Sequence, residues 1–124
     1  MSEENQITTG ESAGRIEVAP EVLATIAHFA ALRVEGVSKM APISPDIARM
    51  FRRATRQNGI VLDLSDEQVR FNIYVIMEPH VNILEASRQI QQAIVEAIDT
   101  MVGIPVDAVN VHVEDVVYKQ GEVI

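Results

Sequence analysis

The sequence predicts an α+β domain, a two-layer sandwich with a mostly antiparallel sheet and helices packed on one face. Three observations favour this class. The chain has 124 residues, the length of one domain with one core. Residues 69–77 alternate between apolar and polar side chains, which is typical of a strand. Segments 20–34 and 83–101 repeat apolar residues at steps of three and four, which is typical of amphipathic helices.

The domain is expected to span residues 14–119. The polar residues 1–13 predict a flexible N-terminal tail, and residues 120–124 a short C-terminal tail. Residues 15–18 alternate and predict a first short strand. Pro20 suits the first position of a helix, and Gly36 can adopt a conformation that ends it.

A second helix is predicted after Ser44, a favourable N-cap, with Pro45 at its first position and Arg56 near its end. Asn58-Gly59 then marks a turn. This helix is treated as an insertion between the first half of the domain and the strands that follow.

The second half of the chain predicts two hairpin strands, a long helix and a last strand. The strands are expected at residues 60–64 and 69–77, and the last at residues 106–118 with a bulge near 115–117. Asn82 and Glu85 form a capping-box-like start of the helix, and Gly103 is its expected end. The order of elements suggests a ferredoxin-like arrangement with the extra helical insertion.

Charge and composition argue against several classes of function. There are 10 basic and 18 acidic residues, so the net charge of −8 opposes general nucleic-acid binding. The chain has no cysteine, which removes disulfides, thiolate metal sites and cysteine nucleophiles. No apolar run approaches the ~18 residues of a membrane span. The acidic start is unlike a signal peptide, so a cytoplasmic location is expected, with any approach to the inner face of the membrane made through a partner.

No catalytic residue, metal site or cofactor is expected. The six glycines are scattered and form no phosphate-binding loop. The three histidines lie far apart at positions 28, 80 and 112, and His28 falls in an apolar helix, where a packed residue is the simpler interpretation. His112 and Glu114 share one strand face, where a metal or proton-transfer role and an ordinary polar surface both remain open.

Two candidate surfaces for binding emerge. The first is a basic stripe on the helix predicted for residues 45–56, which is either a solvated face or a site for lipid headgroups, an acidic protein or RNA; it consists of Arg49, Arg52, Arg53 and Arg56. The second is the sheet face that the helices leave open, expected to serve self-association or to be ordinary surface. That face is predicted to carry Arg70, Asn72, Tyr74, Ile76, Asn110 and His112, beside Val61, Asp63 and Glu114.

Several short motifs together carry a family resemblance. They are GRIEVAPEV from residue 14, VEGV from 34, GIVL from 59, VNI from 81, MVGI from 101 and VNVHVE from 109. This pattern, over about residues 14–118, resembles the alkaline shock protein family, also called the Gls-type envelope stress response proteins of Gram-positive bacteria. At one position the family often has glycine where this chain has His80.

The resemblance implies a non-catalytic protein of cell-envelope homeostasis and stress response. Such a protein would self-associate as a scaffold or adaptor, and membrane-anchored partner proteins would recruit it. It carries over no catalytic residue, and a shared family does not define a biochemical activity. Three alternatives remain: a regulatory accessory protein of a metabolic enzyme, for example in fatty-acid use, an RNA-binding module, and an enzyme whose residues assemble from distant positions.

Overall fold

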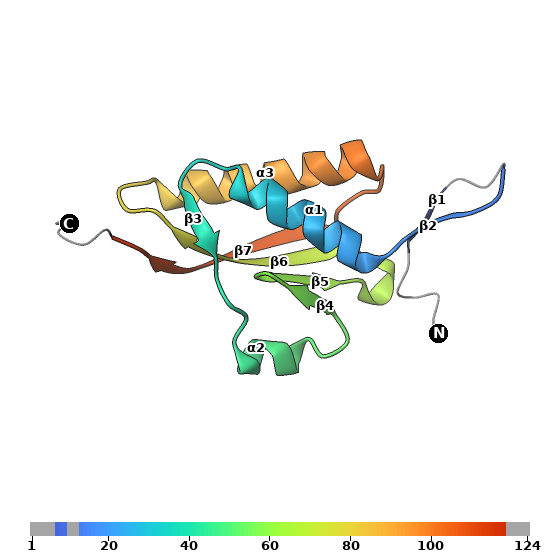
Figure 1. Ribbon diagram of the computed structural model, residues 1–124, viewed down its shortest axis with the longest axis horizontal. Helices are drawn as coiled ribbons and strands as arrows, with labels where there is room; N and C mark the ends of the chain where they lie inside the picture. Colours follow the sequence, from blue (N-terminus) through green and yellow to red (C-terminus); the bar gives the residue numbers. More distant parts are fainter. Residues whose placement is uncertain (1–6, 10–12, 119–124) are drawn as a thin grey trace.

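The computed structural model of the chain describes residues 7–9 and 13–118. A five-stranded sheet is formed by β3 (Val37–Met40), β4 (Thr55–Gln57), β5 (Ile60–Asp63), β6 (Arg70–Met77) and β7 (Ala108–Val116). The helices α1 (Pro20–Leu32) and α3 (Ile83–Met101) cover one face, and the short α2 (Pro45–Met50) lies beyond the other (Figure 1). The predicted α+β class with a mostly antiparallel sheet is confirmed.

Strand β6 is the centre of the sheet. Along one edge it pairs antiparallel with β5 through residues 70–73 and with β3 through residues 75–77, so β3 and β5 lie end to end. Along the other edge it pairs with β7, and this pairing is parallel. The register between β6 and β7 shifts at Glu114, because Val75 pairs with Val113 and Ile76 with Asp115. The bulge expected near the end of the last strand is therefore present, one residue earlier than predicted.

The main core lies between the two long helices and the sheet. The residues of β6 that face the helices are fully buried, and so is the isoleucine stripe of α3, Ile90, Ile94 and Ile98. Burial of each such side chain contributes roughly 1.5–3 kcal/mol, which is how the amphipathic pattern of the sequence becomes a fixed packing of helix on sheet.

The helix ends follow the sequence signals. Pro20 begins α1, and the Ser44 hydroxyl accepts a hydrogen bond from the Ile47 amide, 3.2 Å away, at the start of α2. The Asn82 side chain accepts one from the Glu85 amide at 2.9 Å, where α3 begins. His80 has a φ of 65°, a left-handed conformation that favours glycine, in line with the glycine that the family resemblance implies at this position.

Two features of the predicted topology are wrong. The first short strand, β2 (Ile16–Val18), pairs with β1 (Ile7–Thr9) in a separate hairpin at one end of the molecule, outside the main sheet (Figure 1). In addition, β7 lies directly beside β6, because α3 makes a parallel crossover between neighbouring strands. The strand order is consequently not ferredoxin-like.

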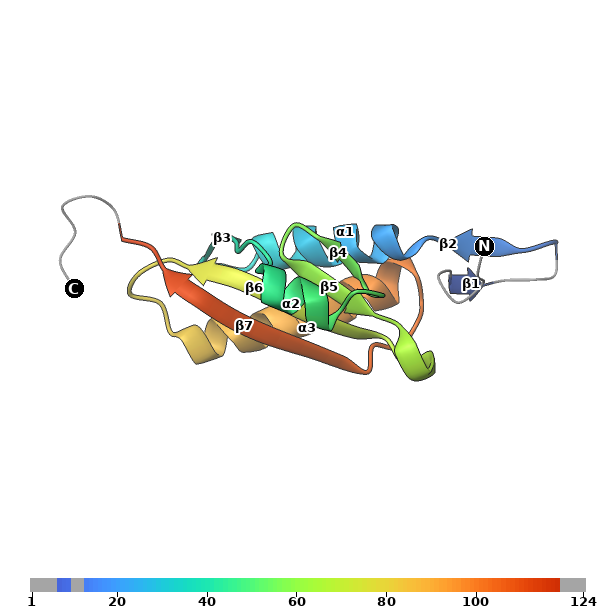
Figure 2. The same ribbon diagram turned by 90° about the horizontal axis from the view of Figure 1, so that it is seen from below.

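The inserted helix also differs from its prediction. It ends at Met50, with Phe51 already outside helical geometry (φ −118°, ψ 46°), and Thr55–Gln57 form β4. Pairing of β4 with β5, Thr55 opposite Leu62, replaces the expected helical turns. Figure 2 shows α2 against the sheet face opposite α1 and α3, so the helices do not all share one face.

The predicted domain boundaries stay predictions. Most of the predicted N-terminal tail and all of the predicted C-terminal tail, residues 120–124, lie outside the described residues. Within the predicted N-terminal tail, Ile7–Thr9 form β1.

Two glycines with positive φ differ in how closely other atoms surround them. Gly59 has a φ of 76°, and a Cβ there would lie 2.8 Å from the Ala41 carbonyl oxygen and 2.9 Å from that of Tyr74. Strain and overpacking together predict that Gly59→Ala lowers the free energy of unfolding by about 3 kcal/mol or more. Gly103 has a similar φ of 78° but open space, so Gly103→Ala should cost only about 1–2 kcal/mol. Urea denaturation of both variants measures the difference; equal losses would contradict the packing argument.

Candidate interaction surfaces

The sheet face predicted to be open is partly a second core. Val61 is fully buried, and Tyr74 and Ile76 are only 4% and 9% exposed. They are covered by partly buried apolar residues of the α2 segment, which are Ile43, Ile47, Phe51 and Ala54. The expected exposure of Tyr74 and Ile76 is therefore wrong, because the inserted segment folds back over this face and buries its large apolar side chains.

The remaining residues of that face form a polar network beside β7. The Asn72 Oδ1 lies 3.4 Å from the donating Asn110 Nδ2 and 3.1 Å from His112 Nε2. The His112 ring stacks on Tyr74 with 4.5 Å between ring centroids. Burial, with a smaller effect of the Glu114 charge, raises the pKa of Tyr74. The sequence placed these residues together correctly; their role in self-association stays a prediction.

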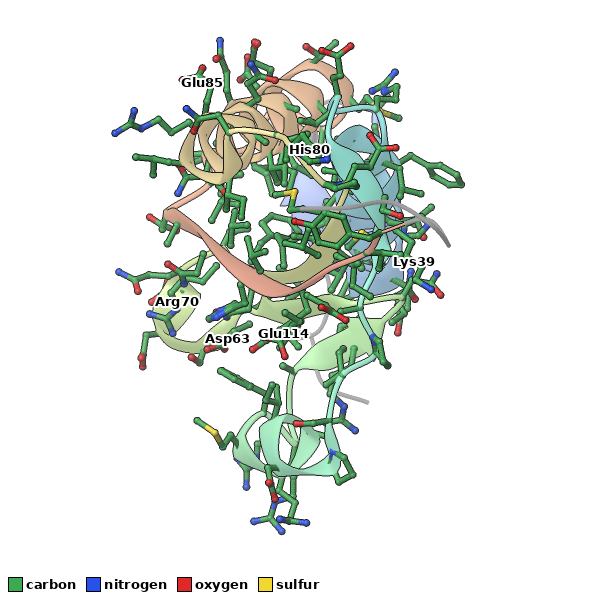
Figure 3. All side chains as sticks on the ribbon, turned by 90° about the vertical axis from the view of Figure 1, so that its left-hand side faces the viewer. Lys39, Asp63, Arg70, His80, Glu85 and Glu114 are labelled. Atoms are coloured by element: carbon green, nitrogen blue, oxygen red, sulfur yellow. The ribbon has the colours of Figure 1, made fainter. Side chains whose placement is uncertain are left out.

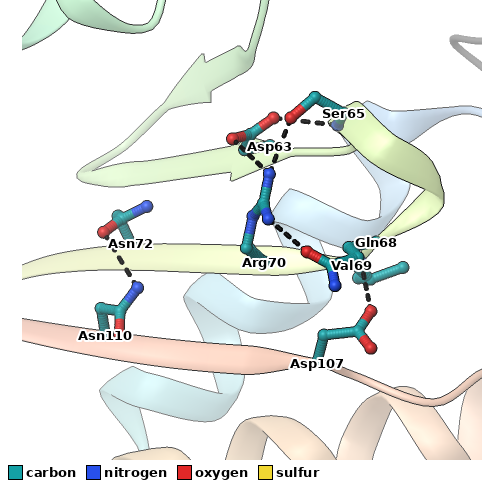
Figure 4. Close-up of polar contacts among 8 residues, drawn as sticks. All are labelled: Asp63, Ser65, Gln68, Val69, Arg70, Asn72, Asp107 and Asn110. Atoms are coloured by element: carbon teal, nitrogen blue, oxygen red, sulfur yellow. Dashed lines mark hydrogen bonds and ion pairs between the residues drawn. The ribbon is translucent and has the colours of Figure 1, made fainter.

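Arg70 belongs to an anchor at the loop end of the β5–β6 hairpin, where residues 64–69 connect the two strands. Its guanidinium contacts Asp63 Oδ2 at 3.2 Å and the Ser65 hydroxyl at 2.7 Å, and it also donates to Gln68 (Figure 4). Burial acts to raise the pKa of Asp63, but hydrogen bonds from Ser65 and Arg70 outweigh it and lower that pKa below its ordinary value. This arrangement ties the hairpin together and accounts for Arg70 as a structural residue.

The predicted basic stripe is divided in the structure. Arg49 pairs with Asp46, and Arg56, on β4, donates to the Phe51 carbonyl at 2.8 Å and the Ala48 carbonyl at 3.2 Å, which satisfies carbonyls at the end of α2. Among the described residues, Arg52 and Arg53 have no hydrogen-bond or ion-pair partner. With Arg49 and the 75% exposed Met50 they lie around a hollow of about 340 Å³, whose far wall includes Asp63 and Ser65. We call Arg49, Met50, Arg52 and Arg53 the basic lobe; the grouping of Arg56 with it is wrong.

A larger hollow of about 630 Å³ lies between α1, β3, α2 and the β4–β5 turn. Its apolar lining is Leu32, Met40, Ala41, Pro42, Ile43 and Ala48. Its charged lining consists of Lys39 and Arg56, with no carboxylate, although the whole chain carries a net charge of −8. Figure 3 shows Lys39 on the opposite side of the molecule from Arg70.

Exposed apolar side chains lie on α1, the helix whose His28 and Leu32 line this hollow. Phe29 is 59% exposed, Leu32, which also lines the hollow, is 37% exposed, and Val22 lies two turns before Phe29 on the same helix face. The neighbouring His28 packs edge-on against Phe29, and its buried Nδ1 has no hydrogen-bond partner. We call the hollow and these α1 residues the groove surface.

Sequence reasoning missed the groove surface. A signal was available, because α1 carries Val22, Phe29 and Leu32 outside the apolar stripe that faces the core. Within the described part of the chain, no three His, Asp or Glu side chains gather to hold a metal ion. Over the same residues, no helix has the length and apolarity required to cross a lipid bilayer.

The hairpin anchor predicts a pH-dependent contribution to stability. Because the pKa of Asp63 is lower in the folded chain than in the unfolded one, its charge stabilises the fold above pH ~4, and this contribution disappears as the pH falls. Asp63→Asn should cost about 1 kcal/mol at pH 7, with a difference from wild type that shrinks in acid. Urea denaturation at several pH values measures this, with Asp99→Asn on the exposed face of α3 as the control. A loss that stays constant with pH would contradict the assignment.

Comparison with known proteins places the chain among related bacterial proteins. It is 33% identical over 113 residues to the uncharacterized protein Spy1535 of Streptococcus pyogenes serotype M6, which covers 90% of this chain and 86% of that protein. It is 27% identical over 101 residues to the uncharacterized protein YqhY of Bacillus subtilis, covering 81% and 75%. No solved structure matches the chain.

A family model covers nearly all of the described fold. It matches residues 8–118 and is described as the family of alkaline shock protein 23, with a cell envelope-related function. This confirms the resemblance that the sequence motifs indicated. The chain belongs to this alkaline shock protein family.

Proposed function

We propose that the chain is a non-catalytic adaptor of cell-envelope homeostasis that self-associates and is recruited near the membrane by protein partners. The envelope-related role of the family supports the setting. The groove surface is the observation that carries the binding role, because Leu32 lines a hollow of about 630 Å³ and Phe29, three residues before it on α1, is 59% exposed.

The groove surface has the composition of a protein-binding site. Large aromatic anchors beside an apolar pocket dominate the energy of many protein interfaces. Burying Phe29 under a partner would contribute roughly 1.5–3 kcal/mol, and Leu32 and Val22 extend the same contact along α1. The shape therefore suits a segment that presents apolar side chains to the hollow.

The charges of the hollow indicate the chemistry of the partner. Lys39 and Arg56 line it without a carboxylate, so the local field favours negative charge. Because complementary charge speeds association and fixes orientation, the partner is proposed to be a membrane-anchored protein with an acidic segment that carries apolar anchors.

The basic lobe supports a second contact, with an anionic lipid surface. Arg52 and Arg53 have no partner within the described structure, and Met50 beside them is 75% exposed. Each basic residue near an anionic membrane contributes about 1 kcal/mol, so these two arginines would assist recruitment by a partner without replacing it.

The first functional prediction concerns Phe29. Phe29→Asp should abolish capture of the partner and disperse a fluorescent fusion from the cell periphery, since the substitution places a charge where an apolar anchor is needed. Met101→Asp is the matched control, because Met101 is 68% exposed on α3, outside the groove surface. The measurements are fluorescence microscopy and crosslinking in cells, followed by identification of the crosslinked protein.

Three outcomes would contradict this function. One is a Phe29→Asp variant that retains both its location and its crosslinks. Another is equal loss in the Met101→Asp control, which would indicate unfolding or a different surface. Crosslinks to a metabolic enzyme, or to RNA, would instead favour the accessory or RNA-binding alternatives.

The basic lobe is tested with lipid vesicles. The wild-type chain should co-sediment weakly with vesicles that contain anionic phosphatidylglycerol, and less so as salt is raised, because screening weakens surface charges. Replacing Arg52 and Arg53 with Glu should remove this binding, whereas Arg33→Glu at the end of α1 should not. Binding that is unchanged by either salt or the double substitution would exclude the lipid contact.

A further inference from the structure

We propose that the outer edge of β7 pairs antiparallel with β7 of a second copy of the chain, which forms a two-fold dimer with one continuous sheet. This inference rests on the self-association that is part of the proposed function, and it assigns a surface to that self-association. It keeps Asn110 and His112 of the predicted self-association face and leaves out Tyr74 and Ile76, which are buried.

The direction of the backbone groups identifies the open edge. In β6, the Tyr74 amide donates to the Gly59 carbonyl and the Tyr74 carbonyl accepts from the Ala41 amide, each at 2.8 Å, so even-numbered residues point toward β5 and β3. The odd-numbered Val69 carbonyl accepts from the amides of Asp107 and Ala108 instead. Because the directions alternate along extended strands, the even residues of β7 before the bulge face β6, and the odd ones, Val109 to Val113, face away. Beyond the bulge this order is reversed, since the Val117 amide donates to the Met77 carbonyl.

The outward groups of β7 are those of Val109, Val111 and Val113. The Val109 carbonyl accepts a hydrogen bond from Gln91 Nε2 of α3 at 3.0 Å, which confirms that this residue points out of the sheet. Among the described residues, the amides and carbonyls of Val111 and Val113 have no partner. Figure 2 shows β7 running along the margin of the sheet with no strand beyond it.

Apart from the Gln91 side chain of α3 on the Val109 carbonyl, this edge lacks the usual protection against strand pairing. Natural edge strands carry lysine, proline or inward charges to prevent association. Residues 109–113 read VNVHV and contain neither lysine nor proline. The bulge at Glu114, followed by Asp115, ends the regular stretch and so limits pairing to these five residues.

A second copy fits the edge because the stretch is self-complementary. With the two-fold axis at Val111, each Val111 exchanges its amide and carbonyl with Val111 of the other copy, and Val109 pairs with Val113. On the sheet face that the helices cover, this pairing brings the valine side chains of the two copies into contact. On the opposite side it places Asn110 across from His112, two polar groups able to hydrogen-bond.

The helix layer supports the same partner. Leu84 and Val95 are 61% and 41% exposed, and they lie seven residues before and four residues after Gln91, on the flank of α3 that reaches the β7 edge. Pairing of the two β7 strands would place the α3 helices of the two copies next to each other on one side of the joined sheet. The second copy would thus cover apolar residues that are otherwise exposed.

The first test is sedimentation velocity over a range of concentrations. The wild type should show a monomer–dimer equilibrium. Val111→Pro removes one outward amide, which a proline can replace at an edge without breaking the pairing with β6, and should raise the dimer Kd by about tenfold or more. Leu84→Lys, on the exposed flank, should also weaken the dimer. Circular dichroism establishes whether each variant is folded. If Val111→Pro does not fold, Leu84→Lys alone tests the dimer.

The second test determines the register of the two β7 strands by disulfide crosslinking of introduced cysteines. This is possible because the chain has no cysteine of its own. Asn110→Cys and His112→Cys chains, when mixed, should crosslink, since their Cα atoms would be about 4.5 Å apart across the axis. Each variant alone should crosslink poorly, because identical positions would be about 8 Å apart, too far for a disulfide.

The outcomes separate this proposal from the proposed function. A wild type that is monomeric at all concentrations, a dimer unaffected by Val111→Pro and Leu84→Lys, or equal crosslinking in single and mixed samples would overturn the β7 pairing. A Phe29→Asp chain that still dimerises but loses its partner leaves the pairing intact. A Val111→Pro chain that still binds its partner leaves the groove surface intact.

Discussion

The burial of β6 on both faces is the constraint on which the rest of the structure depends. All residues from Phe71 to Met77 are buried, and the strand is paired along both edges. A strand in this position needs a cover on each side, since its polar-looking face carries Tyr74 and Ile76. The helices α1 and α3 supply one cover, and the segment that contains α2 supplies the other.

This double cover decides which surfaces remain available for binding. The face that alternation in β6 would leave to solvent is occupied by the protein's own inserted segment. Contacts with other molecules are therefore left to places where packing is incomplete. One is the groove surface, where α1 carries exposed Phe29 and Leu32 beside a hollow, and another is the edge of β7.

The same packing gives opposite roles to residues that look alike in the sequence. Arg52 and Arg53 have no partner among the described residues, whereas Arg56 satisfies carbonyls at the end of α2 and Arg70 holds a hairpin together. Helical spacing predicted that Arg56 shares a face with the basic residues before it. This prediction is wrong because the chain leaves the helix and pairs with β5 as strand β4, which begins at Thr55.

The sequence by itself determined the features that depend on local chemistry. These are the α+β class, the starts of the helices at Pro20, Ser44 and Asn82, the alternation of β6, and the family, because caps, periodicity and motifs act over a few residues. Only the tertiary structure decided that β2 pairs with β1 outside the main sheet, that α2 covers the second face, and that the groove surface exists. Those outcomes depend on which distant segments compete for the same apolar surface, and that competition is settled by packing across the whole chain.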